Sequence, residues 1–111
     1  MTTPLKADGR FWLTLDGRNF LGRGRVELLQ RIRETGSISR AAKAMKMSYK
    51  AAWDAVDAMN TAWDVPLVES GPGGSRLTEE AEQLIVAFRR AEAQHTACLE
   101  TLAGNLPQRS G

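Results

Sequence analysis

The stretch GSISRAAKAMKMSYKAAWDAVDAMN, residues 36–60, decides the fold because it holds two alanine-rich helical segments only a few residues apart. Ser39 and Ser48 each precede such a segment, and a serine hydroxyl at a helix start accepts a hydrogen bond from a backbone N–H. We therefore expect both serines to act as helix caps. Between them the chain must reverse direction around AMKM, residues 44–47, as in a helix-turn-helix. Lys46 lies where such turns often use glycine, so a left-handed backbone there would be strained.

Small and apolar side chains in this stretch predict how the two helices pack together. The first helix contributes Ala41, Ala42 and Ala44 to a close helix contact, and the anchors around the turn are Ile38, Met45 and Met47. In the second helix, Ala52, Val56 and Met59 share one face through i, i+4, i+7 spacing. The opposite face is left for another partner, and it carries Tyr49, Lys50, Ala51, Trp53, Asp54 and Asp57.

The neighbouring segments complete a winged helix. Residues 10–17, RFWLTLDG, alternate apolar and polar side chains before an Asp-Gly turn and predict a short strand, with a hairpin arm as the fuller form. Apolar residues at helical spacing predict a helix from about Arg23 to a stop at Gly36. In VPLVESGPGGSRLT, residues 65–78, we expect strands at Leu67–Glu69 and Ser75–Leu77 around a GPGG tip. Arg76 would then reach DNA phosphate or the minor groove.

The remaining sequence predicts one long helix that begins after Thr78 as its cap. Its coiled-coil seam, at 4-3-4-3-4 spacing, consists of Leu84, Phe88, Ala91, His95, Cys98 and Leu102. A helix of about 25 residues is about 37 Å long, more than a compact winged helix covers, so we expect a symmetric dimer. The fold class is mainly α with a small β component: a winged helix-turn-helix over 10–77, a dimerisation helix over 78–104, and flexible ends at 1–9 and 105–111.

Composition limits the classes of function. A chain of 111 residues, 42% of them hydrophobic, is one domain with its own core. It has no apolar run near the roughly 20 residues of a membrane span and no signal peptide, so we expect a cytoplasmic protein without a membrane partner. Residues 1–63 hold 11 Lys and Arg against 6 Asp and Glu, a balance of +5, and residues 64–111 hold 4 against 7, a balance of −3. An anionic partner should therefore meet the first half.

The sequence offers little for catalysis, metals or cofactors, and we expect none of the three. GPGGS lacks the lysine of a phosphate-binding loop, and His95 is the only histidine. His95 and Cys98 are three residues apart, so a dimer would bring together two of each as metal ligands, but packing in the seam is the favoured interpretation.

The motif and its surroundings carry a family resemblance. GSISRAAKAMKMSYKAAWDAVDAMN, preceded by RVELLQRI and followed by PLVES and a glycine-rich wing, resembles the N-terminal DNA-binding domain of the ModE family. These are molybdate-responsive bacterial transcription regulators with a winged helix similar to that of the LysR family. The resemblance covers roughly residues 11–102.

The resemblance implies a homodimer on an inverted repeat of double-stranded DNA near molybdenum-related genes. It places Ser37, Ser39 and Arg40 near the DNA backbone. On the recognition helix it places Ser48, Tyr49, Lys50, Ala51 and Trp53. The chain ends at Gly111, before the oxyanion-binding domain of such regulators. We therefore expect either a single-domain regulator or an isolated domain, with a separate oxyanion-sensing protein as a further partner.

Several residues keep two interpretations. Trp53 either supports the fold against the wing or touches DNA. Asp54 and Asp57 either pair with nearby cations, which we favour, or accept from cytosine N4. A third set, Arg23, Arg25, Arg31 and Arg33, forms either a solvated helix face or phosphate contacts. Trp12 and Trp63 belong to the core or to an interface.

Two functions remain in competition. The favoured one is a sequence-specific transcription regulator. The alternative is a protein-interaction module that keeps the winged-helix shape without specific DNA binding and uses the Trp53 face or the last helix for a protein partner.

Overall fold

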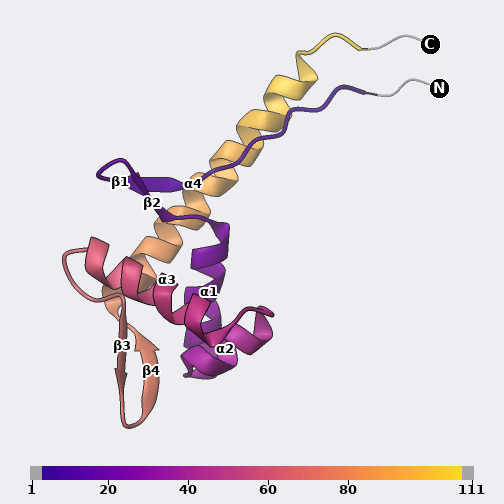
Figure 1. Cartoon of the computed structure of the whole chain (residues 1–111). Helices are drawn as coiled ribbons and strands as arrows, with labels where there is room; N and C mark the ends of the chain where they lie inside the picture. Colours follow the sequence, from indigo (N-terminus) through magenta and orange to yellow (C-terminus); the bar gives the residue numbers. More distant parts are fainter. Residues whose placement is uncertain (1–3, 109–111) are drawn as a thin grey trace.

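The computed structural model describes residues 4–108, so residues 1–3 and 109–111 of the expected flexible ends lie outside the described residues. Four helices and four short strands follow one another along the chain (Figure 1). In sequence order they are β1 (Leu13–Leu15), β2 (Arg18–Leu21), α1 (Arg23–Thr35), α2 (Ile38–Ala44), α3 (Tyr49–Ala62), β3 (Val68–Gly71), β4 (Gly74–Leu77) and α4 (Glu79–Gly104). The predicted winged helix-turn-helix with a long last helix is confirmed.

Both pairs of strands are antiparallel hairpins. Asp16 and Gly17, at the turn between β1 and β2, both have positive φ, 52° and 76°. In the wing, Gly71 pairs with Gly74, and only Pro72 and Gly73 form the tip. The predicted wing strands were therefore too short at the tip, because the glycines expected to be loop continue the ladder.

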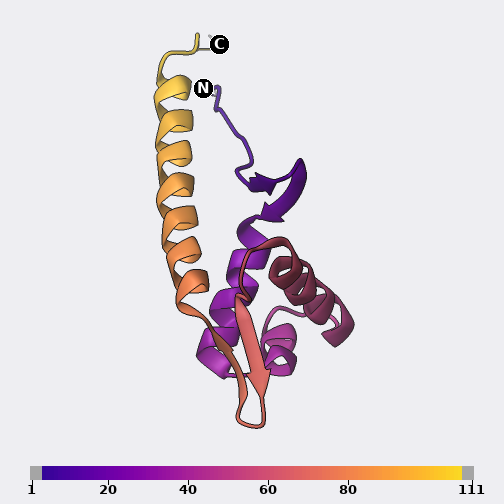
Figure 2. The same ribbon diagram turned by 90° about the vertical axis from the view of Figure 1, so that its left-hand side faces the viewer.

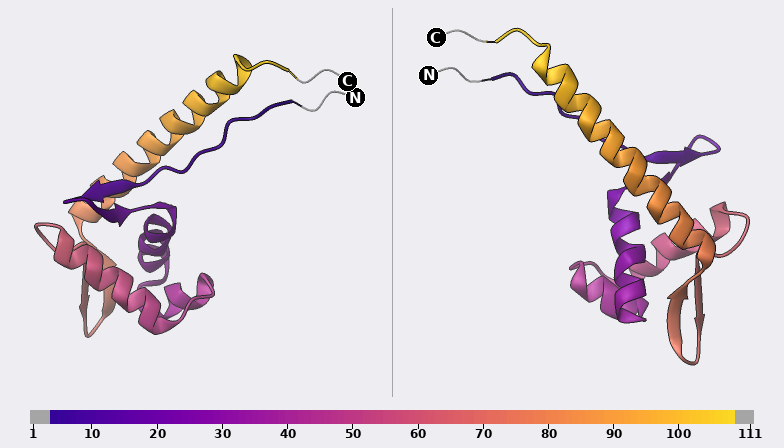
Figure 3. Two further views of the ribbon diagram at one scale, coloured as in Figure 1. Left: turned by 45° about the horizontal axis from the view of Figure 1, so that its top comes forward. Right: turned by 180° about the vertical axis from the view of Figure 1, so that it is seen from behind.

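The molecule is elongated, with principal extents of 63 × 28 × 21 Å. Figure 2 shows the wing, α2 and α3 at one end and α4 projecting toward the other. The N-terminal segment runs beside α4 in both views of Figure 3, and Gly9 lies close to the His95 ring. The two ends of the described chain therefore lie far from the wing.

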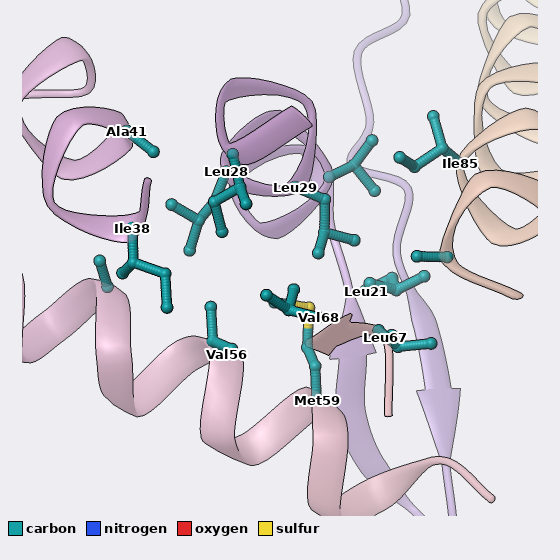
Figure 4. Packing of buried hydrophobic residues seen from close by; sticks show 14 of the residues in the cluster. Leu21, Leu28, Leu29, Ile38, Ala41, Val56, Met59, Leu67, Val68 and Ile85 are labelled. Atoms are coloured by element: carbon teal, nitrogen blue, oxygen red, sulfur yellow. The ribbon is translucent and has the colours of Figure 1, made fainter. Parts of the chain in front are cut away.

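One hydrophobic cluster joins all four helices (Figure 4). The predicted core face of α3 is confirmed, since Ala52, Val56 and Met59 are buried. Ala41 and Ala42 of α2 are also buried, but Ala44 is exposed, so its predicted place in the helix contact was wrong. Ala44 is the last residue of α2, where the chain turns away toward α3.

The structure at the two ends of α2 corrects the predicted cap and shows the expected left-handed turn. Ser37, not Ser39, caps α2, because its hydroxyl accepts a hydrogen bond from the Arg40 amide at 3.1 Å. α2 begins at Ile38, two residues earlier than a cap at Ser39 would give, and Ser39 lies exposed in its first turn. Lys46 has a φ of 55°, as expected for a left-handed turn residue.

α4 is fastened to the rest of the molecule along its first half. The Phe88 side chain is fully buried and its ring centroid lies 5.5 Å from that of Phe11. One turn on, Glu92 accepts hydrogen bonds from Arg23 at 3.0 Å and Arg89 at 3.1 Å. Burial raises the pKa of Glu92, but the two arginines outweigh it and hold the pKa below the ordinary 4.5.

Trp63 stacks on Phe20, which confirms the interpretation of Trp63 as a core residue.

Glu92 makes stability depend on pH. Its pKa is lower in the folded chain, so its contribution is complete above the unfolded pKa and is lost as pH falls through the folded pKa. We expect Glu92→Gln to lower the free energy of unfolding at pH 7 and to have a smaller effect near pH 3. Urea unfolding at both pH values measures this. Glu100→Gln, an exposed position on the same helix, is the control, and equal losses for Glu92→Gln at both pH values would contradict the assignment.

Candidate nucleic-acid interface

The starts of α2 and α3 and the wing together line an open groove at one end of the molecule. Its lining residues are Ser37, Ile38, Ser39, Tyr49, Trp53, Ser70, Gly71, Gly74 and Ser75. The groove brings together residues from both sides of the helix-turn-helix and from both strands of the wing. Four of the residues predicted for DNA contact therefore lie beside the wing, namely Ser37, Ser39, Tyr49 and Trp53.

Hydrogen bonds fix the wing against the helices. The Ser75 amide donates to the Gly36 carbonyl at 2.9 Å, which joins β4 to the end of α1. At this approach, a Cβ on Gly74 would lie only 2.5 Å from the Gly36 oxygen. The other strand is held by Asn60 on α3, whose Oδ1 accepts from the Leu67 and Val68 amides at 2.8 and 3.1 Å. The wing is thus positioned by a backbone hydrogen bond to the end of α1 and by the Asn60 side chain of α3.

Two aromatic side chains project from the start of α3. Tyr49 is 56% exposed and Trp53, one turn later, is 47% exposed. Both line the groove, so Trp53 faces the wing while much of its ring remains open to solvent. Its two predicted roles are therefore not exclusive in this geometry.

Serine caps leave the start of α3 open to anions. The Ser48 hydroxyl accepts from the Ala51 amide at 3.0 Å, which confirms this predicted cap. The first turn of α3 has no acidic residue, whereas the first turn of α4 has Glu79, Glu80 and Glu82. Because the N-terminal end of a helix carries partial positive charge, α3 is suited to approach phosphate.

The cations on this surface fall into two groups. Lys50 pairs with Asp54 at 2.9 Å, and Arg76 in the wing pairs with Glu69 at 3.2 Å. Pairing was the favoured prediction for Asp54 and Asp57. It is confirmed for Asp54, whereas Asp57 forms no ion pair among the described residues. Within residues 4–108, the exposed cations of α2 and the following turn form no ion pair, and these are Arg40, Lys43 and Lys46. Lys43 and Lys46 were missed by sequence reasoning, although Arg40 and Lys43 are three residues apart on one helix.

The arginines of α1 are engaged within the fold. Arg23 pairs with Glu92, Arg33 pairs with Glu82 across to α4, and Arg31 pairs with Glu27 and Glu34 on its own helix. Arg25 donates to the backbone carbonyls of Asn19 and Phe20. Of the two interpretations, these contacts favour a helix face over phosphate contact, but the arginines of this face are held by partners within the chain and not by solvent alone.

The predicted dimerisation seam on α4 does not form one uniform surface. Phe88 is buried within the chain, so its side chain is not available to a second subunit. Leu84 packs against the core, and the ring centroid of His95 lies 5.7 Å from that of Phe11. Ala91 is half-buried, while Cys98 and Leu102 are exposed. The first half of the seam therefore serves the fold, and only its last turns face outward.

A second hollow of about 400 Å³ lies between the N-terminal segment and α4. Trp12 lines it and is 48% exposed, so this side chain is not part of the core.

Over residues 4–108, no cluster of three side chains suited to metal binding occurs. No helix in this part of the chain is long and apolar enough to cross a membrane.

The segment that forms the helix-turn-helix and the wing matches a known protein family. Residues 24–82, from α1 through the wing to the start of α4, match the model for bacterial regulatory helix-turn-helix proteins of the lysR family. The chain belongs to this family. All the residues predicted for DNA contact lie within the segment that matches the lysR family.

The curated relatives of the chain include ModE proteins. The chain is 36% identical over 107 residues to the molybdenum transport protein ModE of Azotobacter vinelandii, covering 92% of this chain and 40% of the relative. It is 43% identical over 89 residues to the transcriptional regulator ModE of Yersinia pestis, covering 76% of this chain and 34% of the relative. The resemblance to ModE regulators is thereby confirmed, and the chain spans less than half the length of these relatives.

A solved structure supports the fold. A complex of the DNA-binding domain of CbnR with DNA superposes with a TM-score of 0.61 at 20% identity, covering 77% of this chain and all of that domain. At this identity the likeness to a lysR-family structure establishes the shared winged helix-turn-helix architecture.

Proposed function

We propose that the chain is a sequence-specific DNA-binding transcription regulator of the ModE type, acting on molybdenum-related genes in the cytoplasm without an enzymatic step. The observation that carries this proposal is the exposed start of α3 beside a fixed wing. In a helix-turn-helix, the N-terminal residues of the second helix contact base edges in the major groove. The alternative of a protein-interaction module is not favoured, because the curated relatives include transcriptional regulators.

The proposed contacts divide between base edges and the phosphate backbone. Tyr49, Lys50 and Trp53 are exposed on α3 and would enter the major groove of DNA, with Ala51 close to the bases. Ser37 and Ser48 hold the helix starts by capping, which leaves their backbones near phosphate. Ser39 and Arg40 on α2 and Arg76 in the wing would contact the backbone on either side.

We further propose a homodimer formed through the far part of α4. Large apolar side chains are exposed there and along the adjoining N-terminal segment: Leu102 on α4, Leu106 just after it, and Leu5. Burial of such side chains between two copies is favourable by about 25 cal/mol per Å². A two-fold dimer would present two copies of α3 to the two halves of an inverted repeat.

The molybdenum link rests on the relatives. The similarity to ModE regulators supports control of molybdenum-related genes, and we propose that a separate oxyanion-sensing protein supplies the signal when these residues act without a sensing domain. Gel-shift titration with and without molybdate tests whether the chain itself responds. We expect unchanged DNA affinity, and a molybdate-dependent shift of the Kd would contradict this part of the proposal.

Selection from a randomised duplex pool tests the function directly. Purified protein would be incubated with the pool, and the retained DNA sequenced. We expect an inverted repeat whose half-sites are about 10 bp apart or a multiple of this spacing. Retention of DNA without any enriched sequence, or no retention, would contradict a specific regulator.

Unpaired lysines of the α2 region should contribute phosphate contacts. We expect the double change Lys43→Gln and Lys46→Gln to weaken binding to every duplex alike, and to reduce the slope of log K against log salt by about 1.8, because each phosphate contact contributes about 0.9. Fluorescence anisotropy at several salt concentrations measures both quantities. Lys6→Gln, an exposed lysine of the N-terminal segment, should leave the slope unchanged. A slope unaltered by the double change would exclude these lysines from the interface.

A further inference from the structure

Asp54 is out of place on a surface that meets DNA, because a carboxylate repels phosphate. It lies one turn after Lys50 on the exposed side of α3, and their side chains are 54% and 85% exposed. The Lys50 Nζ is 2.9 Å from Asp54 Oδ2. The lysine at the start of the recognition helix is thus paired with an acidic neighbour, while Arg40 and Lys43 of α2 form no ion pair within residues 4–108.

The ion pair is poorly arranged for stabilising α3. Lys50 precedes Asp54 along the helix, and this order is less stabilising than an acidic residue followed by a basic one. Lys50 also lies in the first turn, where the helix dipole disfavours a cation. The pair is exposed, so solvent screens the attraction between its members. A role in stability therefore accounts for Asp54 poorly.

The wing repeats the same arrangement. Arg76, whose side chain is 80% exposed, pairs with Glu69 on the facing strand. The two cations best placed to enter the grooves of DNA are both held by carboxylates, whereas Arg40, Lys43 and Lys46 are unpaired within the described residues. Binding through α2 needs no rearrangement, whereas at Lys50 the neighbouring Asp54 carboxylate offsets the charge that would attract phosphate.

We propose that Asp54 is a specificity-determining residue that withholds Lys50 from phosphates and releases it at a G·C base pair. The inference rests on the proposed DNA-binding function and adds the base pair that this pair of side chains recognises. When the ion pair opens, Lys50 needs an acceptor and Asp54 needs a donor. In the major groove, guanine offers the O6 and N7 acceptors and cytosine offers the N4 amino group.

This chemistry makes opening of the ion pair depend on sequence. At a G·C pair, both released side chains regain hydrogen bonds. At an A·T pair, adenine N6 can donate to Asp54, but this donor lies between two separated acceptors, adenine N7 and thymine O4, and the thymine methyl group occupies part of the groove. Lys50 therefore loses the two adjacent acceptors that guanine offers. On non-specific DNA the Asp54 carboxylate stays beside Lys50 and offsets its charge, so the two side chains together add little to phosphate binding.

Asp54→Ala tests the inference, because alanine favours helix and the exposed site tolerates it. The matched control is Asp64→Ala, which makes the same change of charge two residues after the end of α3, and that end lies about 18 Å from Lys50 at 1.5 Å per residue. We expect Asp54→Ala alone to bind a non-specific duplex about threefold to tenfold more tightly at 0.1 M salt, with a salt slope steeper by about 0.9. Anisotropy titrations measure both.

Selection from the randomised pool with wild type and both variants supplies the second readout. We expect wild type and Asp64→Ala to retain a G·C pair at a fixed position of each half-site, and Asp54→Ala to lose that preference while keeping the other positions. If wild type enriches a site but Asp54→Ala keeps every base preference or binds non-specific DNA no more tightly, the inference fails and the regulator stands. If wild type enriches no site, the proposed function fails and the inference falls with it.

Discussion

Gly74→Ala should detach the wing and weaken DNA binding by about tenfold or more, equivalent to about 1.4 kcal/mol. Gly74 has a φ of 111°, a backbone conformation that costs a residue with a side chain about 1–3 kcal/mol. The added Cβ would also lie 2.5 Å from the Gly36 oxygen. The backbones must move apart, and the hydrogen bond from the Ser75 amide to that oxygen is then lost.

Gly73→Ala is the control for this prediction, because a Cβ at Gly73 meets nothing within 4 Å. Both variants would be compared by anisotropy titration on the same duplex and by thermal unfolding. We expect Gly73→Ala to retain the wild-type Kd. Equal affinity of Gly74→Ala and wild type would show that the fixed wing does not take part in binding.

Asn60→Ala should lower the free energy of unfolding by about 3 kcal/mol, because buried backbone groups lose their only side-chain partner. Asn60 Oδ1 accepts from the Leu67 and Val68 amides, and its Nδ2 donates to the Val68 carbonyl at 3.0 Å. Leu67 and Val68 are both buried, so water cannot easily replace these hydrogen bonds. Urea unfolding followed by circular dichroism measures the change.

Two further variants separate hydrogen bonding from other effects of the substitution. Asn60→Asp keeps the acceptor and loses the donor, so we expect a smaller loss than for alanine. Asn19→Ala removes an exposed amide side chain and should change the free energy of unfolding by about 0.5 kcal/mol or less. If Asn60→Ala were no more destabilising than Asn19→Ala, the amide would not hold the wing strand.

Local patterns were enough to predict the helices, the wing hairpin and the first strand, whereas no strand was predicted at β2. The apolar spacing of α1 and α3 and the Asp-Gly turn each depend on neighbours in sequence, and all three appear in the structure. The cap of α2 was misplaced because Ser37 and Ser39 flank the same helix start, and only the backbone geometry decides between them.

Contacts between distant segments were not predictable in this way. The hydrogen bonds of Asn60 and the approach of Gly74 to Gly36 join segments brought together by the tertiary fold. The seam on α4 illustrates the same limit, since its spacing predicted one face for Phe88 and Leu102. Phe11, far away in sequence, covers Phe88 and leaves Leu102 exposed.

The candidate interface was predicted in its location more than in its charge pattern. Tyr49, Lys50 and Trp53 could be placed on α3 because the helix-turn-helix has a fixed order of exposed and buried positions. The free state of Lys43 and Lys46 could not be read from sequence, because it depends on which carboxylates reach them in three dimensions. Ion pairs instead engage Lys50 and Arg76.

The three tryptophans allow the central claim, that α3 and the wing bind DNA, to be measured directly. Each gives one indole N–H signal in a nitrogen-15 correlation spectrum, and DNA would be titrated into labelled protein. Trp53 lines the groove, Trp12 lines the hollow beside α4, and Trp63 donates to Glu80. We predict that the Trp53 signal moves most, together with backbone amides of residues 37–40, 49–53 and 70–76. A larger shift of Trp12, with these amides unmoved, would contradict the account.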